Sequence, residues 1–248
     1  MKETFALLLA YDGGGFRGWQ KQPGQHTVQG ALEDAIRALL GKRYALHGAS
    51  RTDAGVSALG QVVSLQCGRG PDFEKLVLPE GLRLVRAAKA SPSFHARSSS
   101  IGKRYRYRFA AGAESPSAFF LGAQARPDWE RAREALRGLE GLPTLSGLSS
   151  PATDRKPAPP LTSWSLDDDG TLLVLGKAFR KHQVRNLSGH LAAVALGLAS
   201  PGSLRELAGR ERPWMGARAP AHGLTLLEVI YPAELDPFRA DPGPGRAP

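Results

Sequence analysis

Cysteine and asparagine are almost missing from this chain of 248 residues, which contains one of each, Cys67 and Asn186. A single cysteine excludes an internal disulfide and a multi-cysteine zinc site, and such usage is typical of a reducing cytoplasm. Histidine pairs at metal-ligand spacing are missing as well. We therefore predict a cytoplasmic protein without a bound metal.

Long apolar runs are also missing. The segment FALLLAY at 5–11 has the length of a strand, and HLAAVALGLA at 190–199 is interrupted by Gly197. A membrane-spanning helix needs about 20 apolar residues, so we expect no membrane interaction. The apolar content of 42% and charged content of 23% are typical of soluble globular proteins, and the length suffices for one large domain or two packed halves.

Acidic residues are too few to balance the basic ones. The chain has 33 lysines and arginines but only 23 aspartates and glutamates, which gives a formal charge of +10. Of the 33 basic residues, 24 are arginines. The planar guanidinium matches phosphate and stacks on aromatic rings, so this bias indicates a nucleic-acid partner. A GC-rich or heat-adapted genome would give the same composition. Composition alone leaves both interpretations open.

Apolar periodicity and turn residues predict an alternation of strands and helices. Helices are expected at 27–41, 127–141, 180–200 and 204–207. Strands are expected at 3–11, 44–49, 62–67, 83–90, 103–110, 170–179 and 223–232, with 62–67 half-buried. This order indicates an α/β or α+β layer rather than a helical bundle.

The same pattern divides the chain into two halves, although no sequence repeat relates them. We expect an N-terminal half at 1–102, a C-terminal half at 103–232 and a loose tail rich in proline and glycine at 233–248. A cleft between two such halves is the natural place for a site.

Glycines at 13, 15 and 18 match the dinucleotide fingerprint G-x-G-x-x-G after a predicted strand. That chemistry requires a helix to open within the motif, so that its N-terminus meets the pyrophosphate. Pro23 and Gly24 prevent a helix here. We interpret the segment as a turn.

The segment KRYRYRFA at 103–110 combines basic and aromatic residues. Strand alternation places Tyr105 on one face, together with Tyr107 and Phe109, and Arg104 and Arg106 on the other, together with Arg108. Such an arginine row is either a solvated edge or a set of phosphate contacts, with tyrosines available for stacking. We include Lys103, Arg104, Arg106 and Tyr105 among the expected substrate-binding residues.

A second basic cluster opens the helix predicted at 180–200: Arg180, Lys181, His182 and Arg185. Cations at a helix N-terminus oppose the helix dipole, which favours acids there. An anionic ligand or a carboxylate partner would compensate for this conflict, whereas plain solvation of the cluster is the simpler alternative.

Asp53 follows Arg51 in the stretch GASRTDAGV and precedes a predicted strand. An aspartate in a small-residue turn is most often a turn residue. The chain offers no Ser/His/Asp set and no phosphate loop, however, and a guanidinium beside a carboxylate keeps it ionised. We therefore predict Asp53 as a carboxylate nucleophile acting on a base or a sugar.

Five blocks of sequence resemble the tRNA pseudouridine synthase A family. They lie in order over nearly the whole chain, and the block RTDAGV is specific when the others accompany it. The blocks are YDG…GWQ (11–20), RTDAGV (51–56), HAR…KRYRY (95–107), AF…H.VRN..G (178–189) and A..GL.L..V.YP (219–232).

The resemblance implies an isomerase that converts uridine to pseudouridine at positions 38, 39 and 40 of tRNA, in the anticodon stem-loop. It implies no metal, nucleotide or redox cofactor, and a homodimer whose two subunits both contact tRNA. It also implies the pseudouridine-synthase fold, in which two ferredoxin-like or RRM-like halves share a mixed, mostly antiparallel sheet with a central cleft.

For the site, the resemblance implies that Asp53 is the catalytic aspartate and that Arg185 pairs with it. Arg51 would fill the space of the flipped nucleotide or hold that nucleotide, and Tyr105 would stack on the target base. The chain departs from the family pattern at Ser50, Ser57 and Gln183. Two alternatives stay open: an RNA-binding protein without activity, and a glycosidase that releases free uracil.

Overall fold

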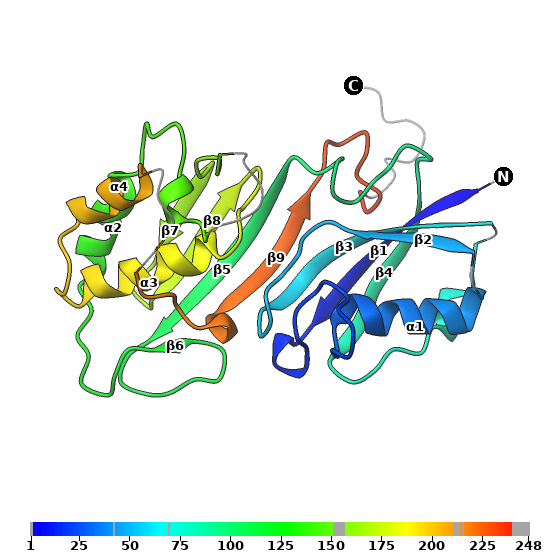
Figure 1. Cartoon of the computed structure of the whole chain (residues 1–248), viewed down its shortest axis with the longest axis horizontal. Helices are drawn as coiled ribbons and strands as arrows, with labels where there is room; N and C mark the ends of the chain where they lie inside the picture. The colour runs from blue at the N-terminus through cyan, green and yellow to red at the C-terminus, as the bar shows by residue number, and fades with distance from the viewer. Residues whose placement is uncertain are drawn as a thin grey trace, which may run out of the picture.

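The computed structural model describes residues 2–41, 43–68, 70–150, 157–210, 214 and 216–239. They form one nine-stranded sheet and four α-helices (Figure 1). The strands are β1 (Glu3–Tyr11), β2 (Tyr44–Gly48), β3 (Ser57–Cys67), β4 (Leu82–Ala90), β5 (Gly102–Ala110), β6 (Phe119–Phe120), β7 (Ser163–Leu166), β8 (Thr171–Gly176) and β9 (Leu224–Ile230). The helices are α1 (Val28–Leu40), α2 (Trp129–Arg137), α3 (Gln183–Ala195) and α4 (Gly202–Ala208).

The two halves of the sheet have the same strand order. The first half runs β4-β1-β3-β2, and the second, with the two-residue strand β6 set aside, runs β9-β5-β8-β7. Each half thus places its four main strands in the order fourth, first, third, second. This is the ferredoxin-like order, and it confirms the expected mixed α/β fold of two similar halves. The domain boundary at 102/103 stays a prediction, and β5 begins at Gly102.

The halves join where β3 pairs with β9. This pair is parallel and short, with Ser57 opposite Thr225 and Ala58 opposite Leu226. The pair of β5 with β6 is also parallel, whereas the other strand pairs of the described residues are antiparallel. The sheet is therefore mixed and mostly antiparallel, as expected.

The helices cover one face of the sheet, with α1 over the first half and α2, α3 and α4 over the second (Figure 1). Strand alternation sends Leu7 and Leu9 of β1 toward this face, where they join one large apolar cluster with residues of the helices. Helix α1 begins as predicted, because the Thr27 hydroxyl accepts a hydrogen bond from the Gly30 N–H at 3.2 Å. None of the helices in the described ranges has the length and apolarity that crossing a membrane requires.

Strand β3 is buried on both faces, which corrects the expectation of a half-buried strand. Val63 and Leu65 face the helices, and Val62 faces a second apolar cluster on the other side of the sheet. Segment 94–96 forms part of that cover, and Tyr231 fixes it by donating a 2.6 Å hydrogen bond from its hydroxyl to the carbonyl of Ala96. A loop and the chain's end supply this cover, so strand periodicity could not predict it.

Four other expectations differ from the structure. Strands β6 and β7 were not predicted, because two and four residues are too short to show a period. Helix α2 ends at Arg137 rather than near Gly141, and α3 begins at Gln183 rather than at 180. The expected loose tail at 233–248 is not loose at Phe238, whose ring packs on the second cluster and lies 5.8 Å from the Arg86 guanidinium. Residues 240–248 lie outside the described part.

Candidate active site

Asp53 opens a tight turn between β2 and β3. Its carbonyl accepts a 3.1 Å hydrogen bond from the Val56 N–H, and Gly55 has a φ of 81°, which favours glycine. The glycine turn after β1 packs directly on this turn: a Cβ on Gly13 would lie 2.3 Å from the carbonyl carbon of Val56. Gly13 and Gly18, two of the three glycines that imitate a dinucleotide motif, therefore allow two backbone turns to approach closely and support Asp53.

The carboxylate of Asp53 is held by Arg185, 132 residues further along the chain. Nη1 of Arg185 donates to Oδ2 of Asp53 at 3.0 Å, and its Nε donates to the Ala219 carbonyl at 2.9 Å. The side chains of Asp53 and Arg185 are 24% and 15% exposed, so solvent or a ligand still reaches the carboxylate. Asp53 also supplies the carboxylate partner that the cations at the start of α3 require.

Arg51 does not make this contact. Its side chain is exposed and, within the described ranges, it forms no ion pair. The guanidinium beside Asp53 in the sequence is therefore not the one beside it in space. Arg51 precedes the tight turn, whereas Asp53 lies within it and faces α3.

His182 lies on the other side of the same carboxylate oxygen. Its Nε2 is 3.6 Å from Oδ2 of Asp53, and its Nδ1 is 2.6 Å from Oγ of Ser150. At φ 62° it is the only non-glycine residue of the described ranges with a positive φ, and such strain is concentrated at functional sites.

The surroundings of His182 favour one tautomer. A carboxylate only accepts hydrogen bonds, so the oxygen of Asp53 at 3.6 Å favours a proton on Nε2. In that tautomer Nδ1 accepts from the hydroxyl of Ser150, which itself accepts from Nη2 of Arg218 at 3.0 Å. Burial lowers the pKa of His182, and the nearby Arg218, Arg185 and Lys181 lower it further, against the opposing effect of Asp53.

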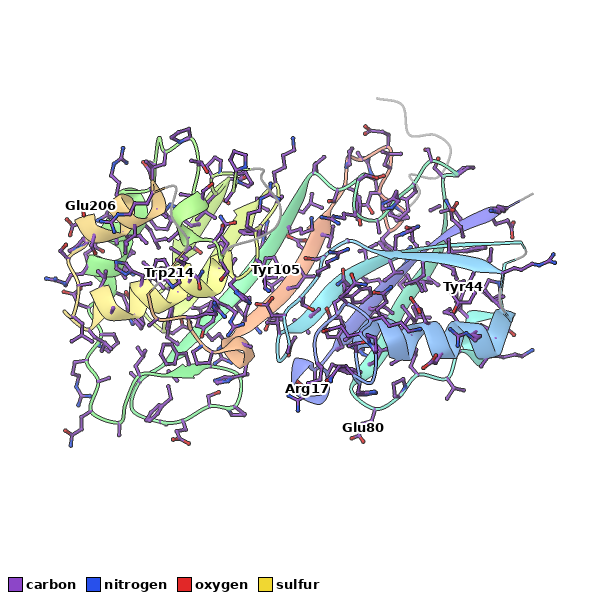
Figure 2. The ribbon with its side chains drawn as sticks, viewed as in Figure 1. Arg17, Tyr44, Glu80, Tyr105, Glu206 and Trp214 are labelled. Carbon is purple, nitrogen blue, oxygen red and sulfur yellow. The ribbon has the colours of Figure 1, made fainter. Side chains whose placement is uncertain are left out.

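Tyr105 of β5 bounds the site on the side of the sheet and lies near the middle of the molecule (Figure 2). Its hydroxyl is 2.8 Å from Oγ of Ser50, and its ring packs edge-on against Phe179 at 5.2 Å. Only 6% of Tyr105 is exposed, and burial raises its pKa to about 12, with a smaller contribution from Asp53 in the same direction. The phenol therefore stays protonated at neutral pH, and little of its ring is open to a base in this state.

The remaining predicted residues do not gather at Asp53 as one group. Arg104 and Arg106 lie on the face of β5 opposite Tyr105, where Arg104 pairs with Glu228 at 3.1 Å. Lys181 is exposed, and Arg180 donates to the Pro157 carbonyl at 3.0 Å. Lys103 is 8% exposed and lies on the Tyr105 face.

Sequence reasoning missed three polar residues that frame the site. Gln61 holds Ser50 by accepting from its N–H at 3.1 Å and donating to its carbonyl at 2.7 Å. Ser150 and Arg218 orient His182 as described above. Arg218 directly precedes the block that begins at Ala219, and this position is the one sequence signal that could have identified it.

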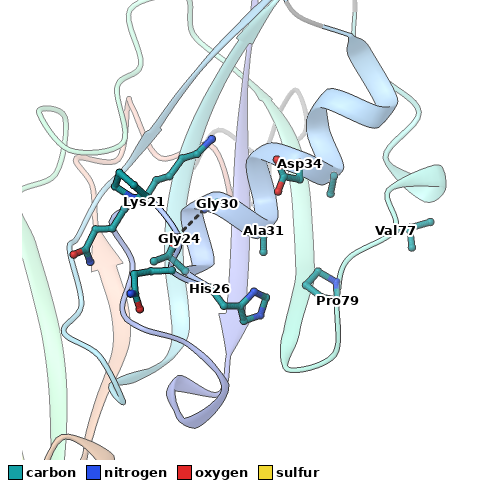
Figure 3. Close-up of a pocket in the computed structure, with 13 residues that line it drawn as sticks. Lys21, Gly24, His26, Gly30, Ala31, Asp34, Val77 and Pro79 are labelled. Atoms are coloured by element: carbon teal, nitrogen blue, oxygen red, sulfur yellow. Dashed lines mark hydrogen bonds between the residues drawn. The ribbon is translucent and has the colours of Figure 1, made fainter.

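A surface groove lies away from Asp53. It has a volume of about 840 Å³ and runs along α1, between the 21–27 loop and residues Val77 and Pro79 (Figure 3). None of the predicted site residues lines it. In the part of the chain that the structure describes, no three His, Cys, Asp or Glu side chains come together as metal ligands would.

Comparisons with known proteins identify relatives of this chain. A family model described as tRNA pseudouridine synthase matches residues 150–232, which include His182, Arg185 and Arg218. The tRNA pseudouridine synthase A of Chloroflexus aurantiacus is 36% identical over 94% of this chain and 90% of its own length. That of Acetivibrio thermocellus is 32% identical, over 91% and 98%.

The chain therefore belongs to the tRNA pseudouridine synthase A family, a family of isomerases. A solved pseudouridylate synthase is similar at 12% identity and a TM-score of 0.38, over 95% of this chain and 67% of its own. This likeness is too weak to bear on the fold, which the strand order of the two halves defines.

Proposed function

We propose that the protein converts uridine to pseudouridine in the anticodon stem-loop of tRNA, with Asp53 as its catalytic carboxylate. The observation that carries the proposal is the position of that carboxylate, 3.0 Å from Arg185 and still 24% exposed, in a chain of formal charge +10. A solvent-reachable carboxylate between a guanidinium and an imidazole suits an attack on a bound nucleotide.

The reaction breaks the bond between N1 of uracil and C1′ of ribose and forms one between C5 and C1′. The proton leaves C5 and N1 regains one, so the product is an isomer and no oxidant or reductant is consumed. Asp53 serves the first step by attacking C1′, by attacking the ring or by removing a sugar proton. Arg185 keeps the carboxylate charged and oriented, and the Nε2–H of His182 faces the same oxygen.

A uridine paired in a stem must leave the helix before its ribose can meet Asp53. Arg51, exposed and free of an ion pair within the described ranges, is suited to hold the displaced strand or fill its space. Tyr105 lines the opposite side of the site. By family membership we extend the proposal to a cytoplasmic homodimer in which both subunits contact the tRNA.

The test is Asp53→Asn with unmodified tRNA, and pseudouridine is mapped by carbodiimide-dependent primer extension. We expect product formation to be abolished while tRNA affinity stays within a few-fold, because the change keeps shape and removes one charge. The matched control is Asp34→Asn on the exposed side of α1, which should leave the rate unchanged. Near wild-type activity of Asp53→Asn would refute the role of this carboxylate.

Product analysis separates the competing functions. A glycosidase would release free uracil and leave an abasic site, whereas an isomerase retains the base in the chain. An RNA-binding protein without activity would bind tRNA with neither product.

A further inference from the structure

Lys103 is a buried cation on the site's side of the sheet. Only 8% of it is exposed, and it extends the inward row of β5 formed by Tyr105, Tyr107 and Phe109. Strand alternation therefore places its side chain on the Tyr105 face, two residues from the ring that contacts Ser50.

The described part of the chain gives Lys103 no counter-charge. Its Nζ donates to Oγ of Ser100 at 3.3 Å, and no carboxylate lies within ion-pair distance. Two exposed lysines differ: Lys21, 45% exposed in its side chain, pairs with Glu33 at 2.8 Å, and Lys89, 68% exposed, pairs with Glu3 at 2.7 Å. Lys103, the most buried of these three lysines, is therefore the one without a carboxylate partner among the described residues.

A charge of the same sign acts on Lys103. Arg97 lies close enough to lower the pKa of Lys103, in addition to the larger effect of burial. Ser100 donates its own proton to the Arg97 carbonyl at 2.9 Å, so it accepts from Lys103 and has no second proton to offer. An ammonium group has three N–H donors. One donates to Ser100, which leaves two for a ligand.

Burying an ammonium without a partner costs several kcal/mol, so an anion that binds beside it from outside the chain gains the attraction that the protein itself leaves unused. The neighbouring residue provides a contrast. Arg104 points to the opposite face and is neutralised within the chain by Glu228 at 3.1 Å. In the sequence, the unpaired cations Lys103 and Arg51 stand near the two residues of the Ser50–Tyr105 contact: Arg51 follows Ser50, and Lys103 precedes Tyr105 by two residues.

We propose that Lys103 forms a phosphate subsite, oriented by Ser100, that binds a backbone phosphodiester of the RNA next to the displaced uridine. This inference rests on the proposed function. Phosphate is the anion that a polynucleotide presents on both sides of every base. A phosphate held here fixes the strand while the base turns toward Asp53.

The first test replaces Lys103 with methionine, which keeps the length of the stem and removes the charge. We expect tRNA to bind about ten-fold more weakly, as the loss of one charge-assisted contact implies. The slope of log affinity against log salt should become shallower by about 0.7–0.9. Lys103→Arg should retain the slope, and Lys75→Met, on an exposed turn, should match wild type in both measurements.

Thermal unfolding of the free protein distinguishes a ligand site from a structural role. In the free protein no RNA compensates the charge of Lys103. Lys103→Met should therefore unfold at the same temperature as wild type or higher. A lower unfolding temperature together with wild-type tRNA affinity would overturn the proposal.

The position of the phosphate is tested with anticodon stem-loop oligonucleotides that carry one neutral methylphosphonate linkage each. Wild type should lose affinity sharply at one linkage beside the target uridine, and Lys103→Met should lose nothing further there. Additive losses at every linkage would exclude a shared contact. Binding is measured independently of product, so a wild-type protein that makes no pseudouridine would refute the proposed function without deciding the subsite.

Discussion

Replacing Arg185 with methionine removes two hydrogen bonds and the charge opposite Asp53 while it keeps most of the side-chain volume. The lost bonds are those to Oδ2 of Asp53 at 3.0 Å and to the Ala219 carbonyl at 2.9 Å. A hydrogen bond to a charged group contributes about 1.5–3 kcal/mol, and the partial exposure of this pair, 15% and 24%, reduces the sum. We expect the free energy of unfolding to fall by about 3 kcal/mol.

Differential scanning calorimetry measures this change. For a chain of this size about 3 kcal/mol corresponds to a fall in Tm of roughly 6–12 °C. Arg51→Met removes the guanidinium next to Asp53 in sequence but no contact, so its Tm should stay within about 2 °C of wild type. Pseudouridine formation by Arg185→Met should be lost, because Asp53 is no longer oriented.

A double-mutant cycle isolates the pair itself. Combining Arg185→Met with Asp53→Asn should give a coupling energy of about 1.5 kcal/mol, since the second change finds the bond already broken. An Arg51→Met variant less stable than Arg185→Met would refute the reasoning, because Arg51 would then be the residue that holds the carboxylate.

Two further predictions concern stability away from the carboxylate. Burial lowers the pKa of His190, which contacts Ser203 at 2.8 Å, so the unfolded chain binds a proton more readily than the folded one and stability should fall as the pH drops below about 6.5. In urea titrations at several pH values, His190→Gln should flatten this dependence by up to about 1.4 kcal/mol per pH unit. An unchanged slope would contradict the role of His190. A Cβ at Gly60 of β3 would lie 2.2 Å from the Leu227 carbonyl oxygen of β9, so Gly60→Ala should lower the free energy of unfolding by about 3 kcal/mol by forcing the two halves apart. The control is Gly202→Ala, because a Cβ on Gly202 would meet open space. Equal stability of the two variants would contradict the close approach of β3 and β9.

Much of the local structure was predictable because it depends on neighbours in the chain. Thr27 caps α1 with its own hydroxyl, and the alternation of β5 buries Tyr105 and exposes Arg104 as expected. The Asp53 turn was recognisable from its small residues, and the cations before α3 indicated a missing carboxylate. Each of these signals lies within a few residues of the feature that it predicts.

Contacts between distant segments were not predictable from periodicity. The sequence places Arg51 beside Asp53, yet a residue that precedes a tight turn points away from one within it. The cover over β3 came from segment 94–96 and Tyr231, which show no strand or helix pattern toward that face. Resemblance to a family supplied the pairing of Asp53 with Arg185, which the residues alone did not.

The sequence by itself determined the alternation of strands and helices, the turn that presents Asp53 and an excess of positive charge. The tertiary structure alone decided that Arg51 forms no ion pair with that carboxylate, that Nε2 of His182 lies 3.6 Å from it and that Lys103 is buried without a counter-charge among the described residues. The physical reason is the joining of the halves through β3 and β9, which brings residues 132 positions apart within 3.0 Å. Local preferences specify the elements, whereas the packing of one half against the other specifies the charges that meet between them.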